Sequence, residues 1–227
     1  MIPWELLDTA EMPGGGGQLR LMRRGTEYVI RLGHTELMNS RLSGSEEALA
    51  TLTAARLRNP AAARVLIGGL GMGFTLRAAE KALGEGARIE VAELVPAVVA
   101  WARGLMAPVF GDCLDDRRVT LLESDVLDVI RKAKRCYDAI LLDVDNGPEG
   151  LTRQENDALY DARGLADAFA ALKPGGVLAV WSSGPDRGFT PRLKRVGFAV
   201  EETTVKADRG KRGARHVIWL ATRPGNG

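Results

Sequence analysis

Hydrophobic and polar residues follow two different patterns along the chain, and the change comes near residue 61. From there on, short apolar runs alternate with segments whose apolar residues recur every three or four positions. Apolar runs of this length predict strands, and the three-to-four spacing predicts helices. The predicted strands lie at residues 64–69, 87–94, 118–125, 137–145, 176–183, 198–205 and 216–223.

Helices predicted between most of these strands imply a mostly parallel sheet that is covered on both faces. The predicted helices include residues 74–84, 96–106, 126–134 and 164–173, and the second begins with proline, which the first turn of a helix tolerates. The last two strands have no helix between them, so the antiparallel edge is expected there. The sequence therefore predicts an α/β fold with a mostly parallel seven-stranded sheet.

The first 60 residues have a different organisation. Three short segments at residues 19–24, 27–33 and 35–41 are separated by turn-like residues and predict a small β-meander. A helix is predicted at residues 45–57, with Ser43 or Ser45 as its N-cap. We therefore predict a β-rich N-terminal cap ending in a helix at residues 1–60, and a second domain at residues 61–227.

Composition narrows the class of protein. The 227 residues carry a net charge of +2, so no overall attraction to nucleic acid or membrane is expected. No apolar run approaches the length of a membrane span, and the start of the chain lacks the pattern of a signal peptide. Two cysteines and two distant histidines predict neither a disulfide framework nor a metal site, and a cytoplasmic location is expected.

The chemistry is predicted where the strands end. The first strand of the second domain leads into the turn Gly69-Leu70-Gly71-Met72-Gly73, where glycines allow the backbone to approach a ligand. The third glycine of a dinucleotide fingerprint is replaced by Phe74, so that motif is excluded. Glu93, Asp125 and Asp143 close the next three strands, at the sheet edge where open α/β proteins bind ligands, and Glu93 is placed to accept hydrogen bonds from ribose hydroxyls.

These residues together resemble a known family. The segments IGGLGMGFTLR, ELVPAVV, DRRVTLLESD, DVDNGPEGL and LKPGGVL are similar to those of spermidine synthase-like proteins, within the class I S-adenosylmethionine-dependent transferases. The resemblance covers residues 30–220. It implies a Rossmann-like sheet ending in a β-hairpin, a β-rich N-terminal cap, a homodimer, and S-adenosylmethionine or its decarboxylated form as donor. The donor-binding residues that it implies are Gly69, Gly71, Gly73, Glu93, Asp125 and Val126.

The sequence departs from the family where the family's reaction is specified. Gly71 stands where aminopropyltransferases carry an aspartate for the amine of a decarboxylated donor. The family's glutamine and Tyr-His pair are loosely matched by Glu36, Ser45 and Glu46. Of the family's two aspartates after the fourth strand, Asp143 matches the first. The second is either shifted to Asp145 or replaced by Asn146.

Three functions follow as hypotheses. The first is methyl transfer from S-adenosylmethionine to a small acceptor, with Asp143 as the catalytic residue and Glu46, Asp145 and Asn146 as acceptor-binding residues. The second is aminopropyl transfer from the decarboxylated donor, as in polyamine synthesis. The third is donor binding without catalysis, in a sensor or partner subunit. No nucleic-acid or membrane partner is expected. Trp181 is predicted to reach the mouth of the pocket, and His216 is interpreted as structural.

Overall fold

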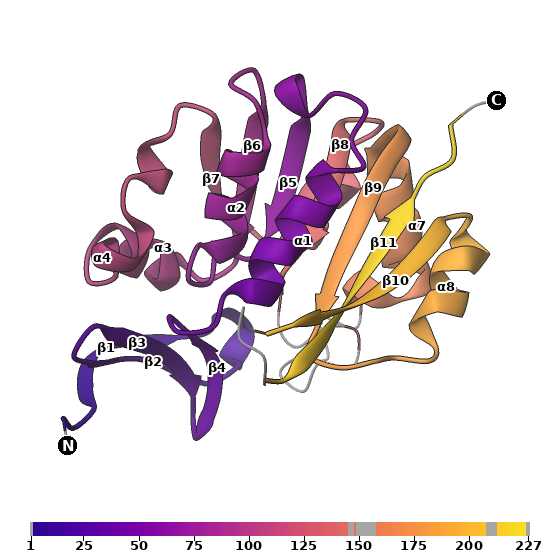
Figure 1. Cartoon of the computed structure of the whole chain (residues 1–227). Coiled ribbons are helices and arrows are strands. Elements are labelled where there is room, and N and C mark those ends of the chain that lie inside the picture. Colours follow the sequence, from indigo (N-terminus) through magenta and orange to yellow (C-terminus); the bar gives the residue numbers. More distant parts are fainter. Residues whose placement is uncertain (1, 145–147, 149–157, 208–212, 226–227) are drawn as a thin grey trace.

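The computed structural model describes residues 2–144, 148, 158–207 and 213–225, which form two sheets with associated helices (Figure 1). The larger sheet has the strand order β10-β11-β9-β8-β5-β6-β7. Its strands are β5 (Arg64–Gly68), β6 (Arg88–Glu93), β7 (Val119–Glu123), β8 (Tyr137–Leu142), β9 (Leu172–Ser182), β10 (Ala199–Lys206) and β11 (Arg215–Thr222). The strands from β9 to β7 are parallel, whereas β11 pairs antiparallel with both β9 and β10. The predicted seven-stranded, mostly parallel sheet with an antiparallel edge is confirmed.

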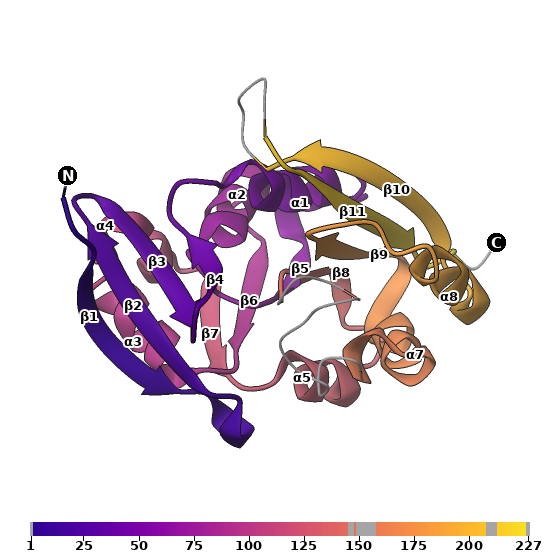
Figure 2. The same cartoon turned by 90° about the horizontal axis from the view of Figure 1, so that it is seen from below.

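Each face of this sheet is covered by helices (Figure 2). Helices α1 (Gly44–Ala54) and α2 (Phe74–Ala82) lie on one face, and α5 (Val126–Lys132), α7 (Ala162–Ala171) and α8 (Phe189–Val196) lie on the other. Alternate residues of a strand point to opposite faces. Val65 and Ile67 therefore belong to the first core, on the side of α1 and α2, and Leu66 belongs to the second core, on the side of α5, α7 and α8. Burial on both faces explains why these strands read as continuous apolar runs. Helix α3 (Pro96–Arg103), which begins at the predicted proline, packs into the first core, and the short α4 (Ala107–Phe110) follows it.

The N-terminal sheet has four strands rather than the three that we predicted. It is an antiparallel meander of β1 (Glu5–Glu11), β2 (Gln18–Arg24), β3 (Glu27–Leu32) and β4 (Thr35–Asn39). Strand β1 was missed because only Leu7 and Ala10 pack against the core, so its sequence shows no clear apolar alternation. The sheet lies across the ends of the large sheet toward which β9 points, below α1 in Figure 1. It therefore covers the edge where the candidate residues were predicted.

Helix α1 connects the two sheets. Its buried residues Leu49 and Ala50 belong to the same core as Leu76 of α2. Part of the predicted N-terminal cap is therefore packed on the large sheet, and the division at residue 60 stays a prediction. Ser43 occupies the N-cap position, but its hydroxyl donates to the Glu47 carboxylate instead of capping the helix, and Ser45 lies inside the helix.

Two further observations complete the fold. Strand β9 starts at Leu172, earlier than predicted. Its pairing with β8 is irregular between Leu172 and Val177, and Gly175 in this segment has a φ of 81°. Within the described part of the chain, no helix is both long enough and apolar enough to cross a membrane.

Candidate active site

The glycine turn between β5 and α2 has the backbone conformation for which glycine is suited. Gly69, Gly71 and Gly73 have φ values of 89°, 53° and 72°. Residues other than glycine rarely adopt such positive φ values. A Cβ atom at Gly69 would lie 2.4 Å from the carbonyl oxygen of Asp143. The turn therefore packs directly against the end of β8, and this contact brings the first and fourth predicted strand ends together.

Gly71 differs from the other two glycines in its surroundings. A Cβ atom at Gly73 would lie 2.6 Å from the ring of Phe110, whereas the nearest atom to one at Gly71 is the Met38 sulfur, 3.6 Å away. The absence of a side chain at Gly71 is thus not required by packing. Its position faces a cavity.

Glu93 braces the glycine turn from the end of β6. Its carboxylate accepts hydrogen bonds from the backbone N–H of Leu70 and of Val95, each at 2.9 Å. Burial raises the pKa of Glu93, and these backbone hydrogen bonds oppose the rise. Each carboxylate oxygen can accept a second hydrogen bond, and Glu93 lines the cavity. The predicted role toward ribose hydroxyls is therefore compatible with the bracing role, which the sequence did not indicate.

Asp125 and Val126 form the start of α5. Asp125 is the N-cap of this helix, and its Oδ1 accepts a hydrogen bond of 2.8 Å from the N–H of Leu127. Val126 takes the first helical position, where the N–H has no acceptor within the helix. Its side chain packs against Gly68, where a Cβ atom would lie 2.9 Å from it. An acceptor oxygen and a backbone donor thus lie next to each other at the cavity wall.

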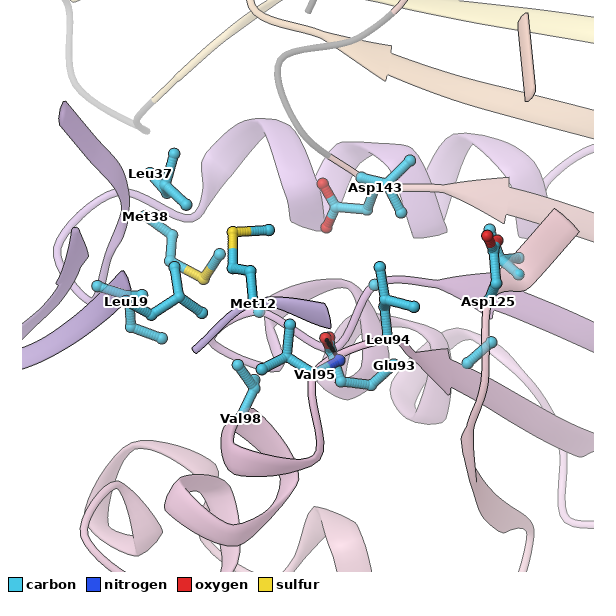
Figure 3. A pocket seen from close by; sticks show the side chains of 16 residues that line it. Met12, Leu19, Leu37, Met38, Glu93, Leu94, Val95, Val98, Asp125 and Asp143 are labelled. Carbon is cyan, nitrogen blue, oxygen red and sulfur yellow. Dashed lines mark hydrogen bonds between the residues drawn. The ribbon is translucent and has the colours of Figure 1, made fainter. Parts of the chain in front are cut away.

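The first cavity lies between the large sheet and the N-terminal sheet (Figure 3). It holds about 780 Å³ of space not filled by protein, a volume that includes open solvent at its mouth. The strand ends and the glycine turn supply its polar lining, and β2 to β4 with the residue after β1 supply apolar side chains. The residues that the sequence did not indicate are Met12, Leu19, Ile30, Leu37, Met38, Ala92, Leu94, Val95, Val98 and Val144.

Asp143 follows β8 and lies at the junction of this cavity with a second one. Its Oδ2 accepts a hydrogen bond of 2.6 Å from the Thr75 hydroxyl of α2. Burial and the neighbouring charge of Glu46 raise the pKa of Asp143 to about 7, although the bond from Thr75 favours the ionised form. Such a carboxyl exchanges protons near neutral pH, as a general base or acid does. Asp145 and Asn146, the other candidates after β8, lie outside the described residues.

The second cavity holds about 630 Å³ on the α1 side of Asp143. It shares Leu37, Met38, Gly71 and Asp143 with the first, and its other lining residues are Asn39, Glu46, Leu70, Met72, Phe74 and Trp181. Glu46 and Trp181 thus lie where the sequence analysis placed them, and the acceptor-binding role of Glu46 stays a prediction. Glu36 lines neither cavity. Its carboxylate accepts a hydrogen bond from Asn39 and pairs with Arg31 and Arg41.

Glu46 is connected to His216 through Ser45. The Ser45 hydroxyl lies 2.6 Å from Glu46 Oε2 and 2.9 Å from His216 Nδ1, and Ser45 is fully buried. The His216 ring meets the Trp181 ring edge-on, with 4.8 Å between centroids. His216 thus lies directly behind the second cavity. Sequence analysis gave no reason to join it to Glu46, since 171 positions separate it from Ser45.

Charge in the two cavities has one sign. Among their described lining residues, the ionisable side chains are Glu46, Glu93, Asp125 and Asp143, and there is no lysine, arginine or histidine. The described residues also contain no cluster of three or more histidine, cysteine or acidic side chains that could hold a metal ion. The lining therefore favours groups that are positively charged or that donate hydrogen bonds.

Comparison with known proteins identifies the fold. No family model and no curated protein matches the chain. Spermidine synthase from Thermotoga maritima matches in structure with a TM-score of 0.76 and 19% identity, over 97% of this chain and 73% of that one. A spermidine synthase in complex with the transition-state analogue AdoDATO matches with a TM-score of 0.75 and 18% identity, over 97% and 73%.

A third structure, a probable spermidine synthase from Corynebacterium glutamicum ATCC 13032, has a TM-score of 0.65 and 16% identity, over 96% of this chain and 80% of that one. At these identities the matches show a shared fold. The chain has the spermidine synthase-like, Rossmann-like fold that its sequence resembled.

Proposed function

We propose that this protein transfers a group from an S-adenosylmethionine-type donor to a small amine acceptor. The first cavity suits such a donor. The glycine turn lets the backbone come close, Glu93 offers acceptor oxygens for ribose hydroxyls, and Asp125 with the N–H of Val126 offers an acceptor and a donor for an adenine edge. The donor, when bound, supplies an activated carbon on a sulfonium, which is its own leaving group.

The position of Asp143 between the two cavities is the observation that carries this proposal. An alkylamine has a pKa of about 10.4 in water and arrives as an ammonium without a free lone pair. Asp143 can bind this cation, orient it and accept its proton, because its own pKa lies near 7 and Thr75 fixes one of its oxygens. We place the acceptor in the second cavity, called the acceptor cavity below, to which Glu46 adds a second acidic side chain.

Methyl transfer from the ordinary donor is the form that Gly71 favours. An aspartate there would place a negative charge beside the donor's methionine carboxylate, which is costly in a closed site. The structure leaves room for a side chain at this position, with only the Met38 sulfur within 4 Å of a Cβ atom. Because Gly71 has no side chain, this space is open to the donor and no carboxylate of the protein lies there.

Aminopropyl transfer from the decarboxylated donor is the second candidate. No cationic side chain is found among the described lining residues to pair with a methionine carboxylate, whereas Glu46 and Asp143 would attract an ammonium. The matched structures are spermidine synthases, and one of them holds AdoDATO. These observations favour the decarboxylated donor, which carries an amine but no methionine carboxylate.

By-product analysis tests the proposal. Purified protein is incubated with each donor and a panel of mono- and diamines, and the thioether by-products are separated. S-adenosylhomocysteine would indicate methyl transfer, and 5′-methylthioadenosine would indicate aminopropyl transfer. Donor binding in calorimetry without either by-product would favour the non-catalytic sensor or partner subunit instead. Failure of both donors and both thioethers to bind would contradict the proposal as a whole.

A further inference from the structure

The hydrogen-bond chain behind the acceptor cavity has a defined direction. A serine hydroxyl carries one hydrogen, and an ionised carboxylate can only accept. When Glu46 is ionised, the Ser45 hydrogen therefore points to Glu46 Oε2, 2.6 Å away. The Ser45 oxygen is then left to accept from His216 Nδ1, 2.9 Å away, and this requires the hydrogen of His216 to be on Nδ1.

The surroundings hold this chain in place. Ser45 is fully buried in α1, so it has no alternative partner in solvent. The His216 ring is fixed by its edge contact with Trp181, which itself is 8% exposed and lines the second cavity. His216 lies on β11 and Trp181 on β9, so rigid strands position both rings.

We propose that His216 is a positioning residue that, acting through Ser45, orients the Glu46 carboxylate toward the acceptor. This inference rests on the acceptor site of the proposed function. Burial raises the pKa of Glu46, and the hydrogen bonds from Ser45 and from the backbone N–H of Glu46 oppose this rise, so losing the Ser45 bond shifts Glu46 further toward its neutral form. A neutral Glu46 is a weaker partner for an ammonium.

The tautomer of His216 tests the proposal without donor, acceptor or turnover. The protein is labelled with ¹⁵N, and the ring nitrogens are observed by NMR at about pH 8, where histidine is neutral. We expect the hydrogen on Nδ1 in the wild type. In Glu46→Leu, the Ser45 hydrogen is released toward His216, so we expect the hydrogen to move to Nε2. Exposed His34 serves as a reference in the same spectrum.

Glu47→Gln is the matched control. Glu47 is the next residue of α1, but its carboxylate accepts from Ser43 and not from Ser45. The tautomer of His216 should therefore not change in this variant. A wild-type His216 with its hydrogen on Nε2, or a tautomer that is the same in wild type and in Glu46→Leu, would overturn the proposal whatever the enzyme transfers.

Two substitutions at His216 connect the spectroscopic test to the acceptor. His216→Phe keeps a ring against Trp181 but removes the hydrogen bond, whereas His216→Asn places an amide near the position of Nδ1. With the amine that the by-product assay identifies, His216→Phe should raise the acceptor KM about tenfold, the equivalent of one hydrogen bond to a charged group. His216→Asn should recover most of this loss, and donor affinity should be unchanged in both. Equal acceptor KM values in His216→Phe and wild type would contradict the positioning role.

Discussion

Asp143 is the residue on which the proposed chemistry depends most. It lies between the two cavities, and its carboxylate is oriented by the Thr75 hydroxyl 2.6 Å away. Asp143→Asn keeps an oxygen that Thr75 can donate to, but removes the charge and the ability to accept a proton. Turnover should fall by about 10²-fold or more, the size expected for loss of a general base. Donor affinity measured by calorimetry should stay nearly the same.

Asp167→Asn is a control for this measurement. Asp167 lies on α7, where it pairs with Arg131 away from both cavities. Asp167→Asn removes the same charge as Asp143→Asn but at a position away from both cavities, so the turnover of this variant should equal that of wild type. Turnover of Asp143→Asn within a few-fold of wild type would show that Asp143 only supports the turn that follows β8.

Glu93 is expected to affect both binding and folding. Glu93→Ala removes the oxygens proposed to accept from the ribose hydroxyls of the donor, and it also removes the bonds from the N–H groups of Leu70 and Val95. Hydrogen bonds to a charged group are each worth about 1.5–3 kcal/mol. We therefore expect donor affinity in calorimetry to fall at least tenfold, about 1.4 kcal/mol, together with a lower Tm. Glu90→Ala separates the two effects. Glu90 lies on the same strand but binds Arg64 and Tyr137, so only its Tm should fall.

At the residue scale, the sequence predicted those site residues whose position follows from a strand end. Glu93, Asp125 and Asp143 meet at one edge because parallel strands place their carboxyl ends together. Met12 and Met38 could not be predicted, since they reach the cavity only because the small sheet lies over that edge. The same holds for His216, which depends on the packing of α1 against β11.

At the scale of the element, the glycine turn offers a test of donor choice. Gly71→Asp should fold, because aspartate tolerates a φ near 53° better than most residues and a Cβ atom there meets nothing closer than the Met38 sulfur at 3.6 Å. Relative affinity should shift toward the decarboxylated donor by about tenfold or more, 1.4 kcal/mol. Competition between the two donors in calorimetry measures this shift.

Gly69→Ala is the contrasting variant in the same turn. Its Cβ would lie 2.4 Å from the Asp143 carbonyl oxygen, so the turn must move. We expect weaker binding of both donors and no change in preference between them. If wild type already prefers the decarboxylated donor tenfold or more (about 1.4 kcal/mol), the argument from Gly71 for methyl transfer is wrong.

Elements were predicted best where local pattern and burial agree. The central strands are apolar on both faces because helices cover both, so their runs were recognised from the sequence alone. Strand β1 was not predicted, because its residues are exposed or half-buried and it pairs with β2 through the backbone. Its place in the meander is a tertiary property that periodicity does not contain.

At the scale of the whole molecule, the site is formed by two sheets together. The large sheet supplies the polar groups of the first cavity, and the N-terminal sheet supplies much of its apolar wall. The sequence predicted both sheets but not how one lies on the other, because strand patterns specify which face is buried and not what buries it. The predicted homodimer and cytoplasmic location stay predictions; light scattering would test the first.

The raised carboxyl pKa values make the stability of the whole protein depend on pH. The pKa of Asp143 is about 7 in the folded chain and about 3.9 when unfolded, so the unfolded state loses its proton first as pH rises. Folding stability therefore falls between about pH 4 and pH 7, because the folded state binds more protons there. Glu80, whose pKa burial raises to about 7, acts in the same direction.

Asp143→Asn should remove the part of this dependence that belongs to the site. At about pH 3 the variant and wild type should have similar stability, because Asp143 is largely protonated in both the folded and the unfolded state. At about pH 8 the variant should be more stable by at most about 4 kcal/mol, since one pKa unit corresponds to 1.36 kcal/mol. Urea unfolding across this range, with Asp167→Asn as the control, measures the difference. A stability difference between Asp143→Asn and wild type that does not change with pH would mean that Asp143 ionises as freely in the folded chain as in the unfolded one, and the general-base role would lose its physical basis.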